Sequence, residues 1–211
     1  MGDKPDRLET RYCKPKMYRH VRATAVKYDR AKDLVTEMLP AIIAGERIDC
    51  LVSGNFIFGD IFVALAVEAN SFIDRLAICT LSISQENVDS LHNLLTGDYV
   101  GRLDLIVSDY FWSHNRASAP YIYEQLDVES RFQLAVGGIH AKIALIQIGE
   151  RKIIIGGSAN LRSSRCVEVF TIETNDTLFD FHAEWMDKTL VAYGTIRKGI
   201  RAGALYDLIK D

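Results

Sequence analysis

The chain contains one long hairpin pattern, made of two runs rich in Ile, Leu and Ala at residues 139–148 and 152–157. The residues between the runs, Gly149, Glu150 and Arg151, form the predicted turn. Because this connection is short, the two runs are expected to pair as neighbouring strands. A fold of this chain must then bring the two far ends of the hairpin together at one edge of a sheet.

Four polar side chains occur at those far ends. His140 and Lys142 are two residues apart on the first arm, and Ser158 and Asn160 are two apart on the second, so each pair shares a face. A neutral imidazole can attack phosphorus, a lysine ammonium can hold a non-bridging oxygen, and hydroxyl and amide groups can donate to the same oxygens. These four residues are the candidate catalytic residues of a reaction at phosphate that requires no metal.

A structural role is the alternative for the same residues. His140 would then be a core histidine bonded to a carbonyl, and Lys142 would extend along the sheet. Ser158 and Asn160 would cap the exit of the chain from a strand. Each residue alone fits this alternative, but one reaction accounts for all four at once.

His140 and Lys142, together with Gly157, Ser158 and Asn160, resemble the H-x-K and G-S-x-N halves of the phospholipase D superfamily signature. The resemblance implies an α/β fold, with a mixed β-sheet flanked by helices on both faces. It also implies a phosphodiesterase that works through a phosphohistidine intermediate.

The family carries an acidic residue after the asparagine, which hydrogen-bonds the histidine and fixes its tautomer. Glu168 is the candidate here, because it takes an apolar place on a predicted strand. Glu173, at the end of that strand, is the alternative, and an ordinary exposed glutamate would also explain it. The chain departs from the signature at Gln147, where the family has an aspartate.

Length and composition set the wider limits. The 211 residues are expected to form a single domain spanning residues 1–211, with the mixture of charged and apolar residues of a soluble protein. The N-terminus is polar, and no apolar run is long enough to cross a bilayer, which predicts a cytoplasmic protein without a membrane partner. The four cysteines are dispersed, so neither a disulfide nor a metal or other cofactor is expected.

The net charge of −3 conceals a basic N-terminal arm, residues 1–27, in which no acidic residue occurs after residue 9. Its Lys14, Lys16, Arg19 and Arg22 are candidate contacts to a nucleic-acid backbone, with aromatic residues interleaved for stacking. The alternative is a solvated arm lying against an acidic surface of the same protein.

Strand and helix patterns alternate before the hairpin. This order favours parallel strands joined by right-handed crossovers, and the short connections that follow favour an antiparallel or mixed continuation. Helices are expected at 29–46, from 60, at 86–95, at 118–129 and from 176, and strands at 49–53, 76–83, 103–108, 132–148, 152–157 and 166–174.

The exits of the first three strands are expected at one edge, where open α/β sheets bind ligands. Ser53 and Gly54 at the first exit are candidate amide donors to a phosphate. At the third exit, Tyr110, Phe111 and Trp112 fit either base stacking or core packing.

A phosphohistidine route needs a second group to protonate the leaving oxygen, and this chain has only one H-x-K sequence. A symmetric homodimer with two copies of His140 in one shared site would supply it, with His114 and His182 as alternatives within the chain. The predicted function is a metal-independent nuclease acting on DNA or RNA. The alternatives are a phospholipase or other phosphodiesterase, and an inactive module that only binds nucleic acid.

Overall fold

The computed structural model describes residues 23–53, 56–115, 117–162 and 166–194. The helices in these ranges are α1 (Ala23–Ala44), α2 (Gly59–Glu68), α3 (Gln85–Thr96), α4 (Asp109–His114), α5 (Ser118–Leu126) and α6 (Asp176–Tyr193). The strands are β1 (Ile48–Ser53), β2 (Arg75–Thr80), β3 (Leu103–Ser108), β4 (Phe132–Gly137), β5 (Ile143–Ile148), β6 (Arg151–Gly157) and β7 (Val167–Thr174).

The strands form one sheet of seven strands in the order β1-β7-β6-β5-β2-β3-β4. β2, β3 and β4 pair in parallel, and every other neighbouring pair is antiparallel. The predicted mixed sheet is therefore confirmed. The hairpin of β5 and β6 is confirmed as well, with Gly149 at φ +56 in its tight turn, a backbone conformation that glycine adopts without strain.

Two details of the strand prediction were wrong. The alternating order of strands and helices favoured β1 as part of a parallel set with β2 and β3, but β1 lies at the far edge of the sheet, where it pairs antiparallel with β7. The single strand predicted at 132–148 is two strands, β4 and β5, which lie in different parts of the sheet. Both errors concern which strands are neighbours, which depends on long-range pairing that local patterns do not encode.

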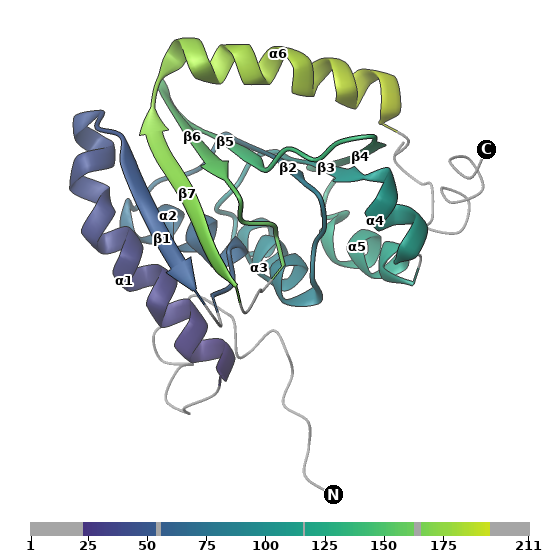
Figure 1. Ribbon diagram of the computed structural model, residues 1–211, viewed down its shortest axis with the longest axis horizontal. Coiled ribbons are helices and arrows are strands. Elements are labelled where there is room, and N and C mark those ends of the chain that lie inside the picture. The colour runs from purple at the N-terminus through teal and green to yellow at the C-terminus, as the bar shows by residue number, and fades with distance from the viewer. Residues whose placement is uncertain (1–22, 54–55, 116, 163–165, 195–211) are drawn as a thin grey trace, which may run out of the picture.

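Helices cover both faces of the sheet, as predicted (Figure 1). One face packs against α1, α2, α3 and α5, and its core contains Phe62, Leu91 and Ile122. The other face packs against α6, which contributes Phe179, Met186 and Leu190. α6 lies across the top of the view in Figure 1, while α3 and α5 lie below the sheet and α1 runs along its left side.

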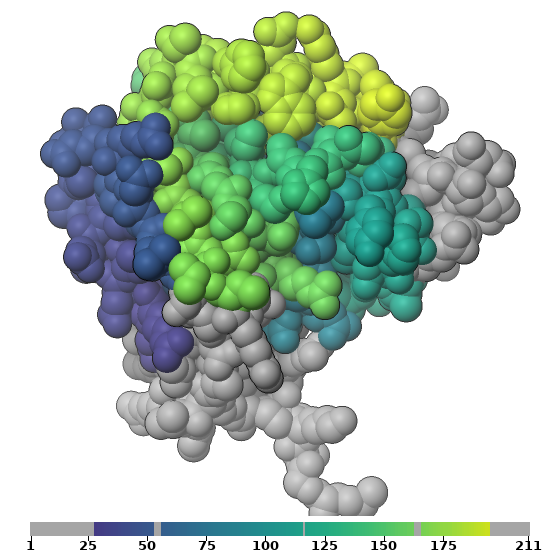
Figure 2. Space-filling view, in the orientation of Figure 1, coloured from purple at the N-terminus to yellow at the C-terminus, as the bar shows by residue number. Residues whose placement is uncertain are grey.

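No helix of the described ranges covers the outer part of the α6 face. Leu51 on β1 and Val169 on β7 are direct neighbours across the two strands, and they are 72% and 52% exposed. Val167, two residues before Val169 on the same face of β7, is 63% exposed. Figure 2 shows the light-green residues of β7 at the surface beside the blue residues of β1. We refer to Leu51, Val167 and Val169 as the apolar strip.

The helix predictions differ from the structure mainly at their ends. α1 begins at Ala23, so the last residues of the predicted basic arm belong to this helix. The short helix α4 was not predicted, and it begins where the Ser108 hydroxyl accepts a hydrogen bond from the N–H of Phe111. Of the aromatic residues that follow, Phe111 and Trp112 are buried, in agreement with core packing. Tyr110 is exposed, so base stacking stays a prediction for it.

A buried carboxylate joins the strands to α6. Asp104 on β3 is fully buried and accepts hydrogen bonds from Arg75 Nε at 2.7 Å and from Arg102 Nε at 2.9 Å. The guanidinium of Arg75 also pairs with Asp187 on α6. Burial lowers the pKa of Arg75, but Asp187 and Asp104 raise it by more, so it lies above its ordinary value.

We expect Asp104→Ala to lower the free energy of unfolding by about 3 to 5 kcal/mol, because it leaves two guanidinium groups without their buried partner. The matched control is Asp187→Ala, whose side chain is 48% exposed and which should cost about 1 kcal/mol or less. Urea denaturation followed by circular dichroism measures both values. Equal losses in the two variants would show that Asp104 is not the anchor of this network.

Candidate active site

The predicted catalytic residues all lie at one edge of the sheet. β6 and β2 run in the same direction. β5 and β7 run in the opposite direction to both of them. The end of β6 therefore lies at the same edge as the beginnings of β5 and β7. This edge, which we call the site edge, contains His140 and Lys142 before β5, Ser158 and Asn160 after β6, and Glu168 near the start of β7.

The segment that carries His140 crosses the site edge instead of continuing a strand. Residues 138–142 connect β4 to β5, and β3 and β2 lie between these strands. The segment thus spans three strand spacings, roughly 14 Å, in an extended conformation. The thiol of Cys79 at the end of β2 lies 3.6 Å from the carbonyl oxygen of Ala141, which places this segment over the end of β2.

The predicted two-residue period is present within this crossing segment. Ile139, Ala141 and Ile143 pack against the core on the α6 side. His140 and Lys142 alternate with them and share the opposite side, where Lys142 Nζ lies 3.2 Å from His140 Nδ1. The same ammonium donates to the His140 carbonyl oxygen at 2.8 Å. An ammonium only donates, so in this arrangement Nδ1 is the acceptor.

Gly157 lets the second half of the signature approach β7 closely. A Cβ at this position would lie 2.3 Å from the carbonyl oxygen of Val169, so no other residue fits without a backbone shift. The Ser158 N–H then donates to that carbonyl at 2.8 Å, and the Ser158 hydroxyl accepts from the Val169 N–H at 3.0 Å. The hydroxyl proton points to the carboxylate of Glu168.

Ser158 and Glu168 therefore form a pair within the site edge. The structure contains no hydrogen bond between Glu168 and His140 among its described residues, since His140 contacts Lys142 instead. The tautomer-fixing role of Glu168 and the donation of Ser158 to a phosphate both stay predictions. Donation from Ser158 to a phosphate requires its hydrogen bond to Glu168 to break, because a hydroxyl has one proton, whereas the Glu168 carboxylate can accept from His140 while keeping that bond.

Asn160 is held by the end of β2. Its Oδ1 accepts a hydrogen bond from the N–H of Leu81 at 3.2 Å. A backbone N–H cannot accept, so this contact identifies the oxygen and leaves the amide nitrogen at the other position. Within the described part of the chain the amide nitrogen has no hydrogen-bond partner, and it carries two donors that suit phosphate oxygens.

Gln147, the departure from the signature, and Glu173, the alternative acidic candidate, both lie at the opposite edge of the sheet. Gln147 is near the end of β5, where its amide nitrogen lies 3.5 Å from the carbonyl oxygen of Gly149. Glu173 is at the far end of β7, about 16 Å along the strand from Glu168. It pairs there with Arg47 at 3.9 Å. Neither side chain is placed to contact His140.

The predicted substrate-binding residues are mostly outside the described ranges. The residues outside these ranges are Lys14, Lys16, Arg19 and Arg22 of the basic arm, and Gly54. The backbone of Ser53 ends β1 at the site edge, opposite Val167. α2 begins at Gly59, close to the predicted start at residue 60, and the role of Ser53 as an amide donor to a phosphate stays a prediction.

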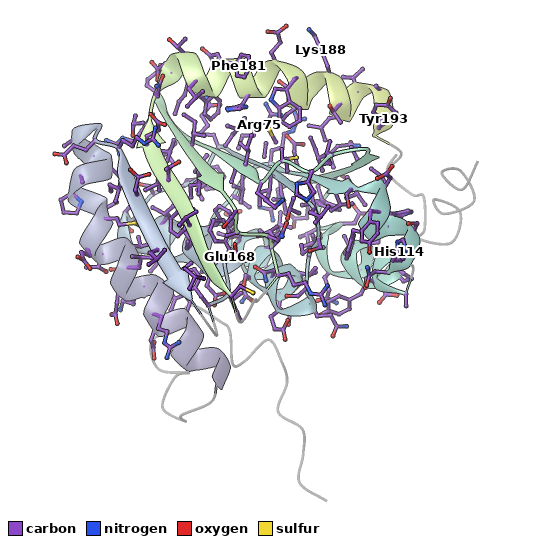
Figure 3. All side chains as sticks on the ribbon, viewed as in Figure 1. Arg75, His114, Glu168, Phe181, Lys188 and Tyr193 are labelled. Carbon is purple, nitrogen blue, oxygen red and sulfur yellow. The ribbon has the colours of Figure 1, made fainter. Side chains whose placement is uncertain are left out.

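The other described histidines make contacts away from His140. His92 Nδ1 lies 2.6 Å from the carbonyl oxygen of Gln125. His114 Nδ1 contacts the Tyr110 carbonyl at 2.8 Å, and its ring lies 4.2 Å from the ring of that tyrosine. His182 accepts from Trp185 Nε1 at 3.1 Å, and burial lowers its pKa. Figure 3 shows His114 on α4, well separated in this view from Glu168.

Two hydroxyl residues that contact this site were missed by the sequence reasoning. The Thr80 hydroxyl accepts from the N–H of Leu161, and the Ser108 hydroxyl donates to the carbonyl of Leu81. Serine and threonine at strand ends are common, so no pattern in the sequence distinguishes these two.

No family model and no curated protein matches the sequence. Solved structures do match the fold. Nuc from Salmonella typhimurium, a phospholipase D family member, is 14% identical, and the match covers 71% of this chain and 97% of Nuc with a TM-score of 0.50. NucT from Helicobacter pylori is 12% identical, with coverage of 71% and 99% and a TM-score of 0.51.

Polyphosphate kinase from Porphyromonas gingivalis matches with a TM-score of 0.51 at 14% identity, over 81% of this chain and 30% of the kinase. The Nuc and NucT matches extend over nearly the whole of those two chains. The protein therefore has the fold of these structures, which confirms the fold that the resemblance of the H-x-K and G-S-x-N pattern implied.

Proposed function

We propose that the protein is a metal-independent phosphodiesterase that cleaves nucleic acid at the site edge. The observation that carries the proposal is the gathering of an imidazole, an ammonium and an unpartnered amide nitrogen on adjacent segments. His140 and Lys142 lie within 3.2 Å of each other, and Asn160 follows the neighbouring strand β6. These groups match the needs of attack on phosphorus, namely a nucleophile and donors for the developing charge.

Substrate binding must rearrange the resting contacts of the site. A phosphate oxygen draws the Lys142 ammonium away from His140 Nδ1, because a charged acceptor binds an ammonium more strongly than a neutral imidazole does. The imidazole then changes tautomer by exchange with water, losing the proton from Nε2 and gaining one on Nδ1, so that it can donate from Nδ1 to Glu168 and attack through Nε2. The bond from phosphorus to the leaving oxygen breaks as the bond to Nε2 forms.

The leaving oxygen needs a proton, and a water molecule must later be activated to release the phosphohistidine. In the proposed homodimer, the partner copy of His140 performs both steps. We favour the partner's His140 over a second histidine of the same chain. The other described histidines, His92, His114 and His182, are already in contact with their own helices and neighbours.

The apolar strip supports the homodimer. Val167 precedes Glu168, so this exposed surface begins at the site edge and continues along β1 and β7. Neighbouring exposed apolar side chains are typical of surfaces that another molecule covers. A two-fold contact through the strip would place two site edges next to each other.

Nucleic acid is the proposed substrate because the basic arm suits a phosphate backbone. A lipid substrate is the second candidate within the same chemistry. No helix in the described ranges is both long and apolar enough to cross a membrane. The cytoplasmic location and the single domain stay predictions.

His140→Ala should lower kcat on bis(p-nitrophenyl) phosphate and on DNA or RNA by about four orders of magnitude or more, because the nucleophile is removed. Lys142→Ala and Asn160→Ala should each lower kcat by about 100- to 1000-fold, as for loss of one donor to the transition state. Steady-state assays of the purified variants measure these values.

His114→Ala and His182→Ala serve as matched controls and should keep wild-type kcat. A large loss in either control would identify that residue as the general acid and remove the need for the partner's His140. Measurable turnover by His140→Ala above a mock preparation would contradict the nucleophile assignment. A wild-type protein that binds nucleic acid without cleaving it would instead support the inactive binding module.

Activity should persist in excess EDTA, because Lys142 supplies the positive charge that a metal ion provides in other phosphodiesterases. Among the described residues, no three side chains of His, Cys, Asp or Glu gather as metal ligands. The measurement is the initial rate before and after chelation. Full loss on chelation, with recovery on adding magnesium or zinc, would show that the reaction uses a metal.

Val169→Asp should make the protein monomeric and inactive, because a carboxylate in the apolar strip opposes burial of that surface. Its effect on the free energy of unfolding should be about 1 kcal/mol, since the side chain is exposed. Sedimentation velocity gives the oligomeric state. Val191→Asp on α6, at a residue that is 88% exposed, is the matched control and should remain dimeric and active.

A further inference from the structure

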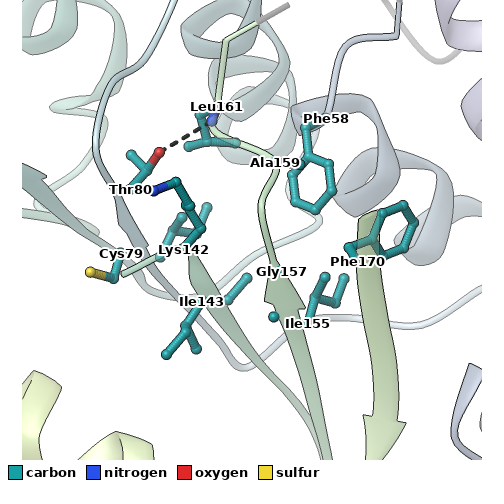
Figure 4. Close-up of a pocket in the computed structure, with 13 residues that line it drawn as sticks. Phe58, Cys79, Thr80, Lys142, Ile143, Ile155, Gly157, Ala159, Leu161 and Phe170 are labelled. Carbon is teal, nitrogen blue, oxygen red and sulfur yellow. Dashed lines mark hydrogen bonds between the residues drawn. The ribbon is translucent and has the colours of Figure 1, made fainter. Parts of the chain in front are cut away.

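Thr80 is a buried hydroxyl residue beside the candidate active site. It is the last residue of β2 and is 1% exposed. Its Oγ1 donates to the carbonyl of Ser82 at 2.9 Å and accepts from the N–H of Leu161 at 3.2 Å. Figure 4 shows the second of these hydrogen bonds, at one end of a small pocket that Lys142 also lines.

Leu161 is held at three points. Its N–H donates to Thr80, its carbonyl accepts from the N–H of Ser84 at 2.7 Å, and its side chain is 1% exposed. The chain after β6 is thereby fixed to the chain after β2. Asn160 is the residue directly before this fixed point, so its backbone position depends on the same contacts.

The side chain of Asn160 is fixed from the same strand end. Leu81 follows Thr80 and donates its N–H to Asn160 Oδ1. The carbonyl of Leu81, in the following peptide group, accepts from the Ser108 hydroxyl at 2.7 Å, so the backbone is held on both sides of Leu81. Both the backbone and the amide oxygen of Asn160 are therefore set by residues 80 and 81.

We propose that Thr80 is a positioning residue for Asn160. Its hydroxyl holds Leu161 so that the Asn160 amide oxygen meets the Leu81 N–H and the amide nitrogen is presented to the phosphate. This assignment rests on the proposed function, because it gives Asn160 a phosphate to bind. Thr80 itself does not touch the substrate.

Thr80→Val tests the hydroxyl alone, because valine keeps the shape and burial of the side chain. The Leu161 N–H then loses its acceptor, and the loop that carries Asn160 shifts. We expect kcat to fall by about 10- to 100-fold with KM changed by less than about threefold, since small displacements of a catalytic group lower the rate strongly. Thr80→Ser retains the hydroxyl and should restore most of the lost activity.

A double-mutant cycle with Asn160→Ala shows whether Thr80 acts through Asn160. If it does, adding Thr80→Val to Asn160→Ala should lower kcat by less than about twofold further. Thr174→Val is the matched control, because its hydroxyl also bonds a backbone carbonyl, that of Ile42, but at the opposite edge of the sheet. The control should leave kcat unchanged. Multiplicative losses in the cycle, or an equal loss in the control, would overturn the assignment.

Amide hydrogen exchange tests the same assignment without turnover. Exchange at Leu161 and Leu81 should become at least about tenfold faster in Thr80→Val and should stay near the wild-type rate in Thr80→Ser. Unchanged exchange at both amides would overturn the assignment whatever the activity. An inactive wild-type protein would overturn the proposed function instead, and the cycle would then be measured on the dissociation constant for inorganic phosphate.

Discussion

The antiparallel pairing of β5 with both β2 and β6 is the constraint on which the candidate active site depends. This pairing puts the start of β5 and the ends of β2 and β6 at the same edge. His140 and Lys142 then reach the region of Asn160 although the hairpin turn is at the other edge. A one-residue slip between the strands would point their side chains to the wrong face.

The two edges of the sheet have different chemistry. At the site edge, hydroxyl, amide and backbone groups of Thr80, Ser158 and Asn160 form hydrogen bonds. The charged side chains described there include Lys142, Glu168 and Asp109, whose carboxylate lies beside Gly138. The ion pairs of Arg75 and Glu173 lie towards the opposite edge. The ion pairs of Arg75 and Glu173 are therefore away from the place where a phosphate would bind. Their charges do not compete with Lys142 for that phosphate.

In the structure the polar side chains of the candidate active site hydrogen-bond to one another. The Lys142 ammonium contacts His140, and the Ser158 hydroxyl contacts Glu168. In the proposed reaction a phosphate replaces both pairings and provides a stronger acceptor for the ammonium. The Asn160 amide nitrogen requires no such exchange, because it has no partner among the described residues. The amide oxygen of the same side chain already accepts from the Leu81 N–H.

The sequence by itself determined the hairpin, the mixed α/β class and the shared face of His140 and Lys142. These follow from side-chain periodicity and short turns, which are local properties of the chain. Only the tertiary structure decided that β1 lies beside β7, that residues 138–142 cross the ends of β3 and β2, and that Thr80 and Leu81 hold Asn160. Contacts between segments that are distant in the chain depend on strand order, and the residues involved, a threonine and a leucine at a strand end, have no distinctive local pattern.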